Sequence, residues 1–203
     1  NACVLHYTEN ASRMKAGDLV LIDAGCEYQG YAADITRTFP VSGQFSPEQR
    51  SIYDLVLEAQ RAAIAKVRPG NTWNQPHDAT VRVITRGLIK LGLLKGKERE
   101  LIKAEAYRDF YMHRAGHWLG LDVHDVGDYR IDGRWRQLEP GMVLPIEPGI
   151  YIAADNTKVA KRWRGIGIRI EDDVAVTETG CDVLTADVPK RADDIEVLMS
   201  RAS

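Results

Sequence analysis

Acidic residues interrupt the strand-like apolar segments of this sequence, and they restrict its fold more than any other feature. Asp23 stands near the end of D-L-V-L-I-D-A, Glu147 stands in L-P-I-E-P-G, and Glu171 follows G-I-G-I-R-I. A carboxylate among apolar residues is costly unless a cation, a hydrogen-bond donor or a metal ion compensates its charge. We therefore expect the chain to fold so that these carboxylates meet compensating groups.

Two extended segments near the start of the chain predict a β-hairpin. Residues 18–24 are apolar and rich in β-branched side chains, and residues 31–41 form the second segment. A turn centred on the tyrosine and glutamine of C-E-Y-Q-G would place Asp23 opposite Asp34, where two carboxylates repel unless a cation lies between them. The alternative is that one aspartate is a turn or cap residue and the other pairs with Arg37 at the surface.

The middle of the chain predicts helices. Ser46, followed by Pro47 and by a glutamine at the third helical position, predicts a capping box, and the Pro-Gly pair at 69–70 is expected to end this helix. A second helix is expected at about 75–91 and a third, mostly exposed one within 95–108. The core face of the first helix is expected to carry Ile52, Leu55, Val56, Ala59 and Ala63.

Strand-like segments return after residue 142. In G-I-G-I-R-I-E-D-D the three isoleucines alternate onto one face, which leaves Arg169 and Glu171 together on the other. A simple salt bridge from Arg169 to Glu171 or Glu147 would also account for these charges. The order of strands, helices and strands predicts an α+β domain whose helices pack on an antiparallel sheet.

Four of the five histidines are candidates for a functional site. They are His6, His113, His117 and His124, and the last three cluster in M-H-R-A-G-H-W-L-G-L-D-V-H-D. The glycines and apolar residues around them indicate a tightly packed backbone, so we expect the imidazoles to line a cleft. His77, which follows a proline at a loop or helix start, is assigned a structural role.

The composition is that of a single soluble globular domain. Of the 203 residues 44% are hydrophobic and 28% are charged. The formal net charge of -2 gives no general attraction to nucleic acid or to an anionic membrane, and no run of 18 apolar residues predicts a membrane span. Three widely spaced cysteines are interpreted as reduced thiols, which favours the cytoplasm. The initial asparagine indicates a fragment.

The acidic residues and one histidine together suit a metal centre. Asp23, Asp34, Glu147 and Glu171 offer oxygen ligands, which favour manganese, magnesium or similar ions over a thiolate-held zinc. Four carboxylates balance two divalent cations. Two such ions about 3.5 to 4 Å apart can bridge and deprotonate a water molecule, so the expected chemistry is metal-assisted hydrolysis.

Six motifs, in this order, resemble those of the Xaa-Pro aminopeptidases: L-H-Y-T-E-N, L-I-D-A-G-C-E-Y, Y-A-A-D-I-T-R-T-F-P, H-W-L-G-L-D-V-H-D-V-G, P-G-M-V-L-P-I-E-P-G-I-Y and R-G-I-G-I-R-I-E-D-D. The resemblance implies the α+β pita-bread (creatinase/aminopeptidase) fold, with a curved antiparallel sheet and helices on its outer face. It also implies that residues 1–203 belong to a catalytic domain that is incomplete at its N-terminus and lacks the separate N-terminal domain of the family.

The resemblance assigns the metal ligands. Asp34 and Glu171 would bridge two divalent ions, Asp23 would complete one site, and His117 and Glu147 would complete the other. The ions would most often be Mn2+, with Co2+, Zn2+ and Mg2+ as alternatives.

The resemblance also assigns catalytic and substrate-binding residues. His6, His113 and His124 would bind the substrate, and His113 and His124 would also act in catalysis, with His124 near the scissile carbonyl. Glu147 would relay protons, and Arg169 would orient the carboxylates.

Four further positions concern the substrate pocket. Trp118 and Tyr151 are expected to shape a proline pocket. Arg114 is bulky and cationic where many members have a small residue, which could change access or specificity, and Pro145 stands where relatives commonly have threonine.

The expected activity is hydrolysis of the bond between an N-terminal residue and a following proline, by a metal-bridging hydroxide. The partner is then a peptide with proline at its second position, and a homo-oligomer stays open. A prolidase, which cleaves only dipeptides, is the main alternative, and methionine aminopeptidase fits the motifs less well. From other classes come a non-catalytic pita-bread module that binds protein partners and a protein whose acidic residues form ordinary salt bridges.

Overall fold

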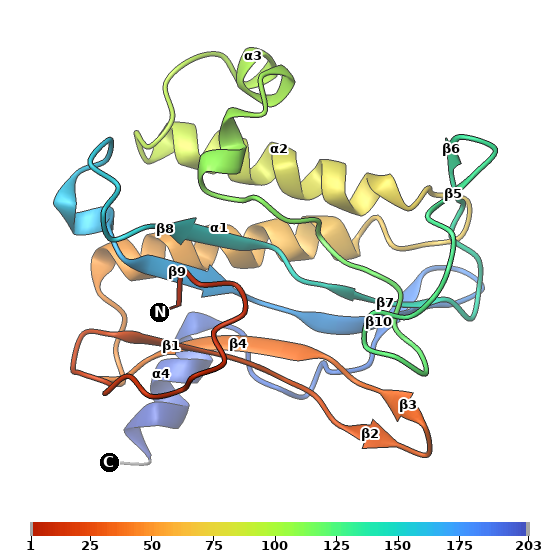
Figure 1. Cartoon of the computed structure of the whole chain (residues 1–203), viewed down its shortest axis with the longest axis horizontal. Helices are drawn as coiled ribbons and strands as arrows, with labels where there is room; N and C mark the ends of the chain where they lie inside the picture. Colours follow the sequence, from red (N-terminus) through yellow and green to blue (C-terminus); the bar gives the residue numbers. More distant parts are fainter. Residues whose placement is uncertain (1, 202–203) are drawn as a thin grey trace.

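Helices cover antiparallel strands in the computed structural model, which describes residues 2–201 (Figure 1). All strand pairs of the described residues are antiparallel, which confirms the α+β prediction. The α-helices are α1 (Pro47–Ile64), α2 (Asn74–Lys90), α3 (Glu98–Lys103) and α4 (Ala192–Ser200), and 3-10 turns span Ala106–Asp109 and Lys161–Trp163. The strands are β1 (Leu19–Ala24), β2 (Glu27–Tyr28), β3 (Tyr31–Ala32), β4 (Ile35–Pro40), β5 (Arg130–Ile131), β6 (Arg134–Trp135), β7 (Val143–Ile146), β8 (Gly149–Ile152), β9 (Ile166–Arg169), β10 (Asp172–Val176) and β11 (Cys181–Val183).

The first hairpin forms, but its predicted register is wrong. Asp23 on β1 pairs with Thr36 on β4, and not with Asp34. The turn lies at Gln29 and Gly30, which both have positive φ, one residue later than the sequence predicted. A tight hairpin turn needs two left-handed residues, and glycine adopts that conformation without strain, so the Gln-Gly pair takes the turn. Asp34 consequently lies between β3 and β4, on the same strand face as Thr36.

The capping box at the start of α1 is confirmed. The Ser46 hydroxyl accepts a hydrogen bond from the Gln49 backbone N–H at 3.2 Å, and the Ser46 N–H donates to the Gln49 side chain at 2.9 Å. All five residues predicted to face the core from this helix are buried. α1 ends at Ile64, before the Pro-Gly pair, and α2 lies within a residue of its predicted bounds. The third predicted helix is a short α3 followed by a 3-10 turn.

Two glutamates interrupt the strands that follow. Glu147 separates β7 from β8, and Glu171 separates β9 from β10. β7 pairs with β10 and β8 pairs with β9 in one shared register, so the two glutamates stand opposite each other at the interruption. Opposed like charges are destabilising in a sheet, so the negative charges of these two glutamates need a nearby cation.

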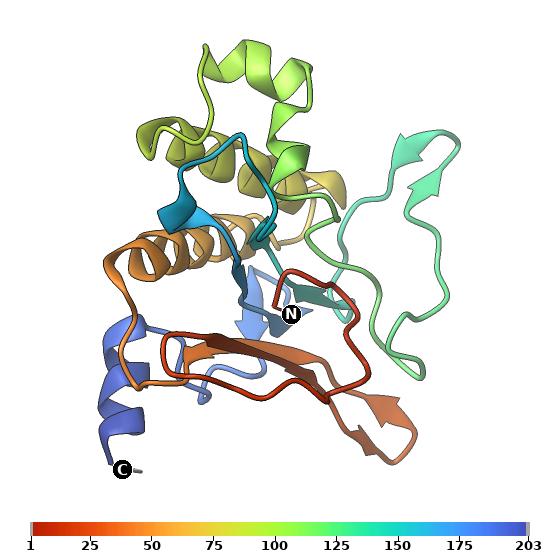
Figure 2. The same ribbon diagram turned by 60° about the vertical axis from the view of Figure 1, so that its left-hand side comes forward.

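The hydrophobic core lies between these strands and the helices. Ile166, Ile168 and Ile170 pack in one cluster with apolar residues of α1 and α2, as their alternation predicted. A second cluster contains Trp73, Trp118 and apolar residues of β7 and β10. Figure 2 shows α2 lying over α1, and α1 lying over the strands. The helices therefore fix one face of the strands and leave the other to carry the polar side chains.

Asp172 joins several elements through its buried carboxylate. It accepts hydrogen bonds from Arg37 at 2.7 Å, Thr185 at 2.7 Å and Gln60 at 2.9 Å, and it also pairs with Lys190. These partners come from β4, α1 and the segment before α4. The surface pairing of Arg37 with Asp23 or Asp34, which the sequence left open, does not form, because Arg37 pairs with Asp172.

We expect the substitution Asp172→Asn to lower the free energy of unfolding by about 3 kcal/mol at neutral pH, because it leaves two cations without their buried partner. Urea denaturation measures this loss. The matched control is Asp182→Asn at an exposed position on β11, where a change within about 0.5 kcal/mol is expected. Equal stabilities of the two variants would contradict the role of Asp172.

The same contact predicts a pH dependence. Burial alone would raise the pKa of Asp172, but hydrogen bonds from Lys190 and Arg37 outweigh it and lower that pKa. A carboxylate with a depressed pKa stabilises the fold above its unfolded pKa of about 3.9, and this contribution is lost as the pH falls through the folded value. The difference in stability between wild type and Asp172→Asn should therefore persist from pH 7 to about 4 and shrink below it.

Candidate functional site

A cavity of about 400 Å³ brings together the predicted metal ligands, the predicted substrate-binding histidines and Arg169. Its lining includes Asp23, Asp34, Glu147, Glu171, His6, His113, His117, His124 and Arg169. These residues come from segments distant in the sequence: the hairpin, the histidine loop and the two interrupted strands. The volume lies within the range of pockets that bind small molecules or short peptides. The predicted cleft lined by histidines is confirmed.

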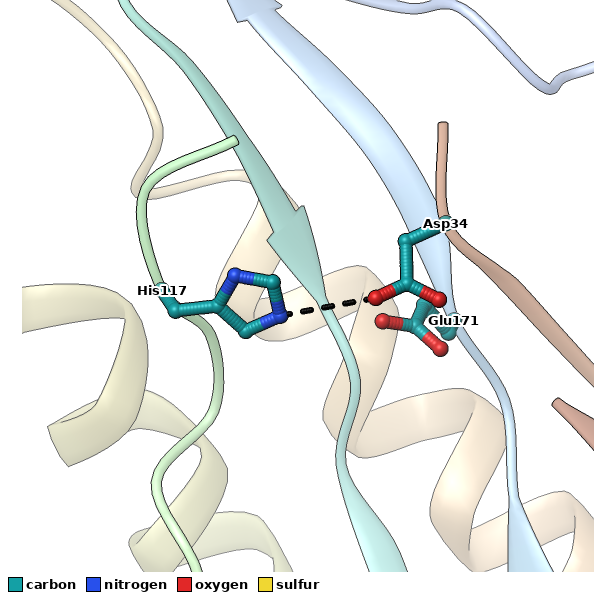
Figure 3. Close-up of side chains that lie close together, drawn as sticks. All are labelled: Asp34, His117 and Glu171. Carbon is teal, nitrogen blue, oxygen red and sulfur yellow. Dashed lines mark ion pairs between the residues drawn. The ribbon is translucent and has the colours of Figure 1, made fainter. Parts of the chain in front are cut away.

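Three side chains at the centre of this cavity have the geometry of a cation site. Asp34, His117 and Glu171 each present a potential ligand atom, and these atoms all lie within 4.8 Å of one another. The Nε2 atom of His117 lies 3.5 Å from Oδ2 of Asp34, as the dashed line in Figure 3 marks. The three side chains reach this point from three separate segments of the chain (Figure 3).

Glu147 lies beside this group. Its carboxylate oxygens are 3.9 Å from Nε2 of His117 and 3.9 Å from Nδ1 of His113. Its backbone N–H donates to the Ala115 carbonyl at 2.9 Å, which ties the interruption between β7 and β8 to the histidine loop. The glutamate is therefore anchored through its main chain, and its carboxylate faces the two imidazoles.

Arg169 supports the other side of the cluster. Its guanidinium contacts Oδ2 of Asp23 at 2.6 Å and donates to Thr36 at 3.2 Å and to the Tyr151 hydroxyl at 3.1 Å. The Thr36 hydroxyl in turn donates to Oε2 of Glu171 at 2.5 Å. The salt bridge that the sequence left open, from Arg169 to Glu171 or Glu147, is thus replaced by one to Asp23.

The two glutamates of the site are buried without enough nearby positive charge to keep their pKa values at the usual level, whereas contacts with His117 and Asp23 lower the pKa of Asp34 in spite of its burial. Burial, with contributions from Asp34 and Asp23, raises the pKa of Glu147 to about 7 in spite of His117 and Arg169. Burial and the neighbouring carboxylates also raise the pKa of Glu171 well above its usual value. Four oxygen donors and one imidazole around a shared space are the ligand set of divalent cations such as Mn2+. The residues present fit such ions.

His117 is oriented as a metal ligand would be. Its Nδ1 lies 2.9 Å from the carbonyl oxygen of Trp118. A carbonyl oxygen only accepts, so Nδ1 carries a proton, and Nε2 is the ring nitrogen that faces the carboxylates. Backbone contacts of this kind fix the tautomer of metal-binding histidines.

His113 and His124 flank the cluster. His113 contacts the Arg114 carbonyl through Nδ1 at 2.7 Å and the Tyr151 hydroxyl through Nε2 at 2.9 Å. Burial lowers the pKa of His113 to about 4, so its imidazole is neutral at neutral pH. The His124 ring lies 4.3 Å from the His117 ring, edge to face.

The aromatic wall of the cavity differs from the predicted one. Trp73, Tyr129 and Trp135 line it, whereas Trp118 packs behind Trp73 with their ring centroids 4.2 Å apart. Tyr151 acts through its hydroxyl, which contacts His113 and Arg169. No local pattern marks Trp73 or Trp135, because a loop far along the chain brings them together. The position of Thr36 could have been predicted, because residues two apart in an extended segment share a face and Thr36 follows Asp34 by two.

The remaining expectations concern His77 and the cysteines. His77 is outside the cavity lining, and its Nδ1 lies 3.5 Å from the Tyr111 hydroxyl. Burial lowers its pKa to about 4, in keeping with a structural role. Cys3, Cys26 and Cys181 form no disulfide with one another. Within residues 2–201, no helix has the length and apolar character needed to cross a membrane.

Comparison with known proteins places this cavity in a family. Residues 1–178 match the model described as Metallopeptidase family M24. The chain belongs to metallopeptidase family M24. It has the pita-bread fold of that family. Membership of this metallopeptidase family implies divalent metal binding, and Asp34, His117 and Glu171 form a possible site for it.

Individual M24 relatives extend the comparison. An Xaa-Pro aminopeptidase of Escherichia coli is 58% identical over 202 residues, which are 100% of this chain and 45% of the relative. The structure of Pseudomonas aeruginosa aminopeptidase PepP is 66% identical, with a TM-score of 0.99, over 100% of this chain and 46% of that one. A variant of Escherichia coli aminopeptidase P in complex with substrate is 57% identical, with a TM-score of 0.96, over 100% and 46%. This chain thus spans about half the length of these M24 relatives.

The packing of Gly116 beside this M24 site predicts the effect of a substitution. A Cβ at this position would lie 2.1 Å from the carbonyl oxygen of Pro145, so Gly116→Ala must push the histidine loop away from β7. We expect a loss of about 1 to 3 kcal/mol in the free energy of unfolding, measured in urea. At Gly180 a Cβ would meet nothing within 4 Å, so Gly180→Ala is the control. Equal stabilities of Gly116→Ala and Gly180→Ala would contradict this prediction, because they would show that the histidine loop can move away from β7 without loss of stability.

Proposed function

We propose that this chain carries the catalytic site of an Xaa-Pro aminopeptidase, which hydrolyses the bond between an N-terminal residue and a following proline. The observation that carries the proposal is the convergence of four carboxylates, four histidines and two arginines on a single cavity. The likeness to Xaa-Pro aminopeptidases over the whole chain supports it. Residues 1–203 would act as one catalytic unit.

The metal centre in this proposal contains two divalent ions, most often Mn2+. Asp34 and Glu171 would be shared between the two ions, Asp23 would complete one site, and His117 and Glu147 would complete the other. The 4.8 Å limit on the Asp34, His117 and Glu171 donors supports the shared position. When bound, such ions lower the pKa of a water molecule and polarise a substrate carbonyl.

The other residues of the cavity would position the substrate and move protons. Glu147 lies between His113 and His117, which suits a carboxylate that passes a proton between the water and the departing amine. His124 packs against the ring of His117, so it would reach the scissile carbonyl from the metal side. Arg169 would keep Asp23 oriented through their 2.6 Å contact.

The aromatic wall supports recognition of proline. Trp73, Tyr129 and Trp135 line the cavity together with Leu5. Flat apolar surfaces of this kind pack well against a pyrrolidine ring, which has no N–H to satisfy within a peptide bond. His6, which also lines the cavity, would bind the substrate beside Leu5. The three free cysteines support a cytoplasmic location for the enzyme.

A comparison of peptide lengths tests the proposed activity. In the presence of Mn2+ we expect release of the N-terminal residue from a tripeptide Xaa-Pro-Zaa, because the cavity is lined beyond the metal ligands and can hold further residues. Mass spectrometry of the products, with the Xaa-Pro dipeptide run in parallel, measures this. Cleavage of the dipeptide alone would replace the proposal with the prolidase alternative.

Metal binding can be tested without activity. Because ions that bind only the folded state stabilise it, Mn2+ at about 100 times its dissociation constant should add about 2.7 kcal/mol to the stability of EDTA-treated protein. Thermal unfolding followed by circular dichroism measures the shift. The variant Glu171→Gln should lose most of it, whereas Glu178→Gln at an exposed position should keep it. An equal shift in both variants would contradict the proposed ligand set.

A further inference from the structure

Arg114 is a cation at the wall of the cavity that the proposed chemistry does not use. It lines the cavity together with Trp73, Tyr129 and Trp135. The acidic residues line the same cavity, so its walls carry both an acidic cluster and a guanidinium. The other guanidinium in the lining, that of Arg169, contacts Asp23 within the acidic cluster.

The guanidinium of Arg114 is held in place by neutral and aromatic partners. Its Nη2 donates to Oδ1 of Asn74, whose Nδ2 donates to Oδ1 of Asp78 at 2.7 Å. Its Cζ lies 5.0 Å from the ring centroid of Trp135, and the Cζ of Arg130 lies 3.9 Å from the same centroid. Two arginines therefore share one indole ring at the edge of the cavity, and Asn74 at the start of α2 orients the first of them.

Neither arginine has an acidic partner in the part of the chain that the structure describes. No carboxylate oxygen of residues 2–201 lies within 4.0 Å of a nitrogen of Arg114 or Arg130. Asp78 reaches Arg114 only through Asn74. Burial lowers the pKa of the Arg114 guanidinium, as expected for a partly desolvated cation without a counter-ion. A preorganised guanidinium on an aromatic ring is well suited to bind a carboxylate through charge-assisted hydrogen bonds.

We propose that Arg114, assisted by Arg130, forms a subsite for a carboxylate on the C-terminal side of the substrate proline. The inference rests on the proposed peptidase function. Cleavage after the first residue would place the amino end of the substrate beside the metal ligands, so the residues after proline would extend along the cavity wall that carries Arg114. The carboxylate is either the C-terminus of a tripeptide or an acidic side chain directly after proline. Arg114 would then set specificity without taking part in bond cleavage.

The competing interpretation is that Arg114 only braces Asn74 against Trp135. A brace would affect all substrates alike, because it would act through the shape of the cavity. A carboxylate subsite would affect only substrates that carry the carboxylate, and mainly through KM. The ratio of kcat/KM between a substrate with the carboxylate and the same substrate without it therefore distinguishes the two interpretations.

Two substrate pairs and two variants test the proposal. The first pair is Xaa-Pro-Ala with a free C-terminal carboxylate and the same peptide with a C-terminal amide. The second pair is amidated Xaa-Pro-Glu and amidated Xaa-Pro-Gln. The variants are Arg114→Gln and the control Arg162→Gln, an exposed arginine 5.7 Å from the Trp163 ring and outside the cavity lining. Rates are measured with Mn2+ over a range of peptide concentrations.

We expect the wild type to prefer the carboxylate member of at least one pair by about tenfold in kcat/KM, which is the size of one charge-assisted hydrogen bond. Arg114→Gln should reduce that preference to about one by raising KM, whereas Arg162→Gln should keep it. The pair that shows the preference identifies the source of the carboxylate. Absence of preference in both pairs, or an equal loss for all four peptides in Arg114→Gln, would overturn the subsite.

A binding measurement keeps this test separate from that of the peptidase function. Isothermal titration calorimetry of the Mn2+-loaded protein with the same four peptides measures affinity without turnover, provided that no peptide is cleaved. If the wild type cleaves none of them, the proposed function fails. A carboxylate preference in binding that Arg114→Gln removes would still support the subsite, and equal affinities would overturn it.

Discussion

Repulsion between Glu147 and Glu171, which stand opposite each other where two strands are interrupted, is the constraint around which the site is arranged. The interruption removes both residues from the ladder, so their side chains meet Asp34 and His117 in the cavity. Burial and the neighbouring carboxylates raise the pKa of both glutamates. Divalent ions would convert this unfavourable cluster into a set of ligands. The burial of two opposed glutamates, which is unfavourable for folding, thus also supplies ligands for the proposed metal ions.

The surrounding structure holds that cluster in place from several directions. Helices α1 and α2 bury the isoleucine face of β9, which directs Arg169 toward the cavity. Thr36 connects Arg169 to Glu171, and the carbonyl of Trp118 fixes the tautomer of His117. Asp172, next to Glu171, anchors β10 to β4 and to the segment before α4 through its buried contacts with Arg37 and Lys190. Asp172, which stabilises the fold, is therefore adjacent in the sequence to Glu171, a proposed metal ligand.

Much of this was accessible from the sequence, and the exceptions have physical reasons. The capping box at Ser46 and the alternation of isoleucines are local patterns, and both predicted the structure correctly. The predicted hairpin register was wrong because it placed the turn at Tyr28 and Gln29, the middle of the connecting segment. The turn instead includes Gly30, which adopts positive φ without strain. The aromatic wall was missed because the path of a long loop brings Tyr129 and Trp135 to the same cavity as Trp73, and such a path leaves no periodic signal.

The central claim is that the five predicted ligands hold a pair of cations. Crystals of the protein grown with Mn2+, with diffraction measured on both sides of the manganese absorption edge, test it directly. We predict two anomalous peaks about 3.5 to 4 Å apart, with Asp34 and Glu171 in contact with both. Absence of peaks in this cavity, or manganese bound at other residues, would contradict it.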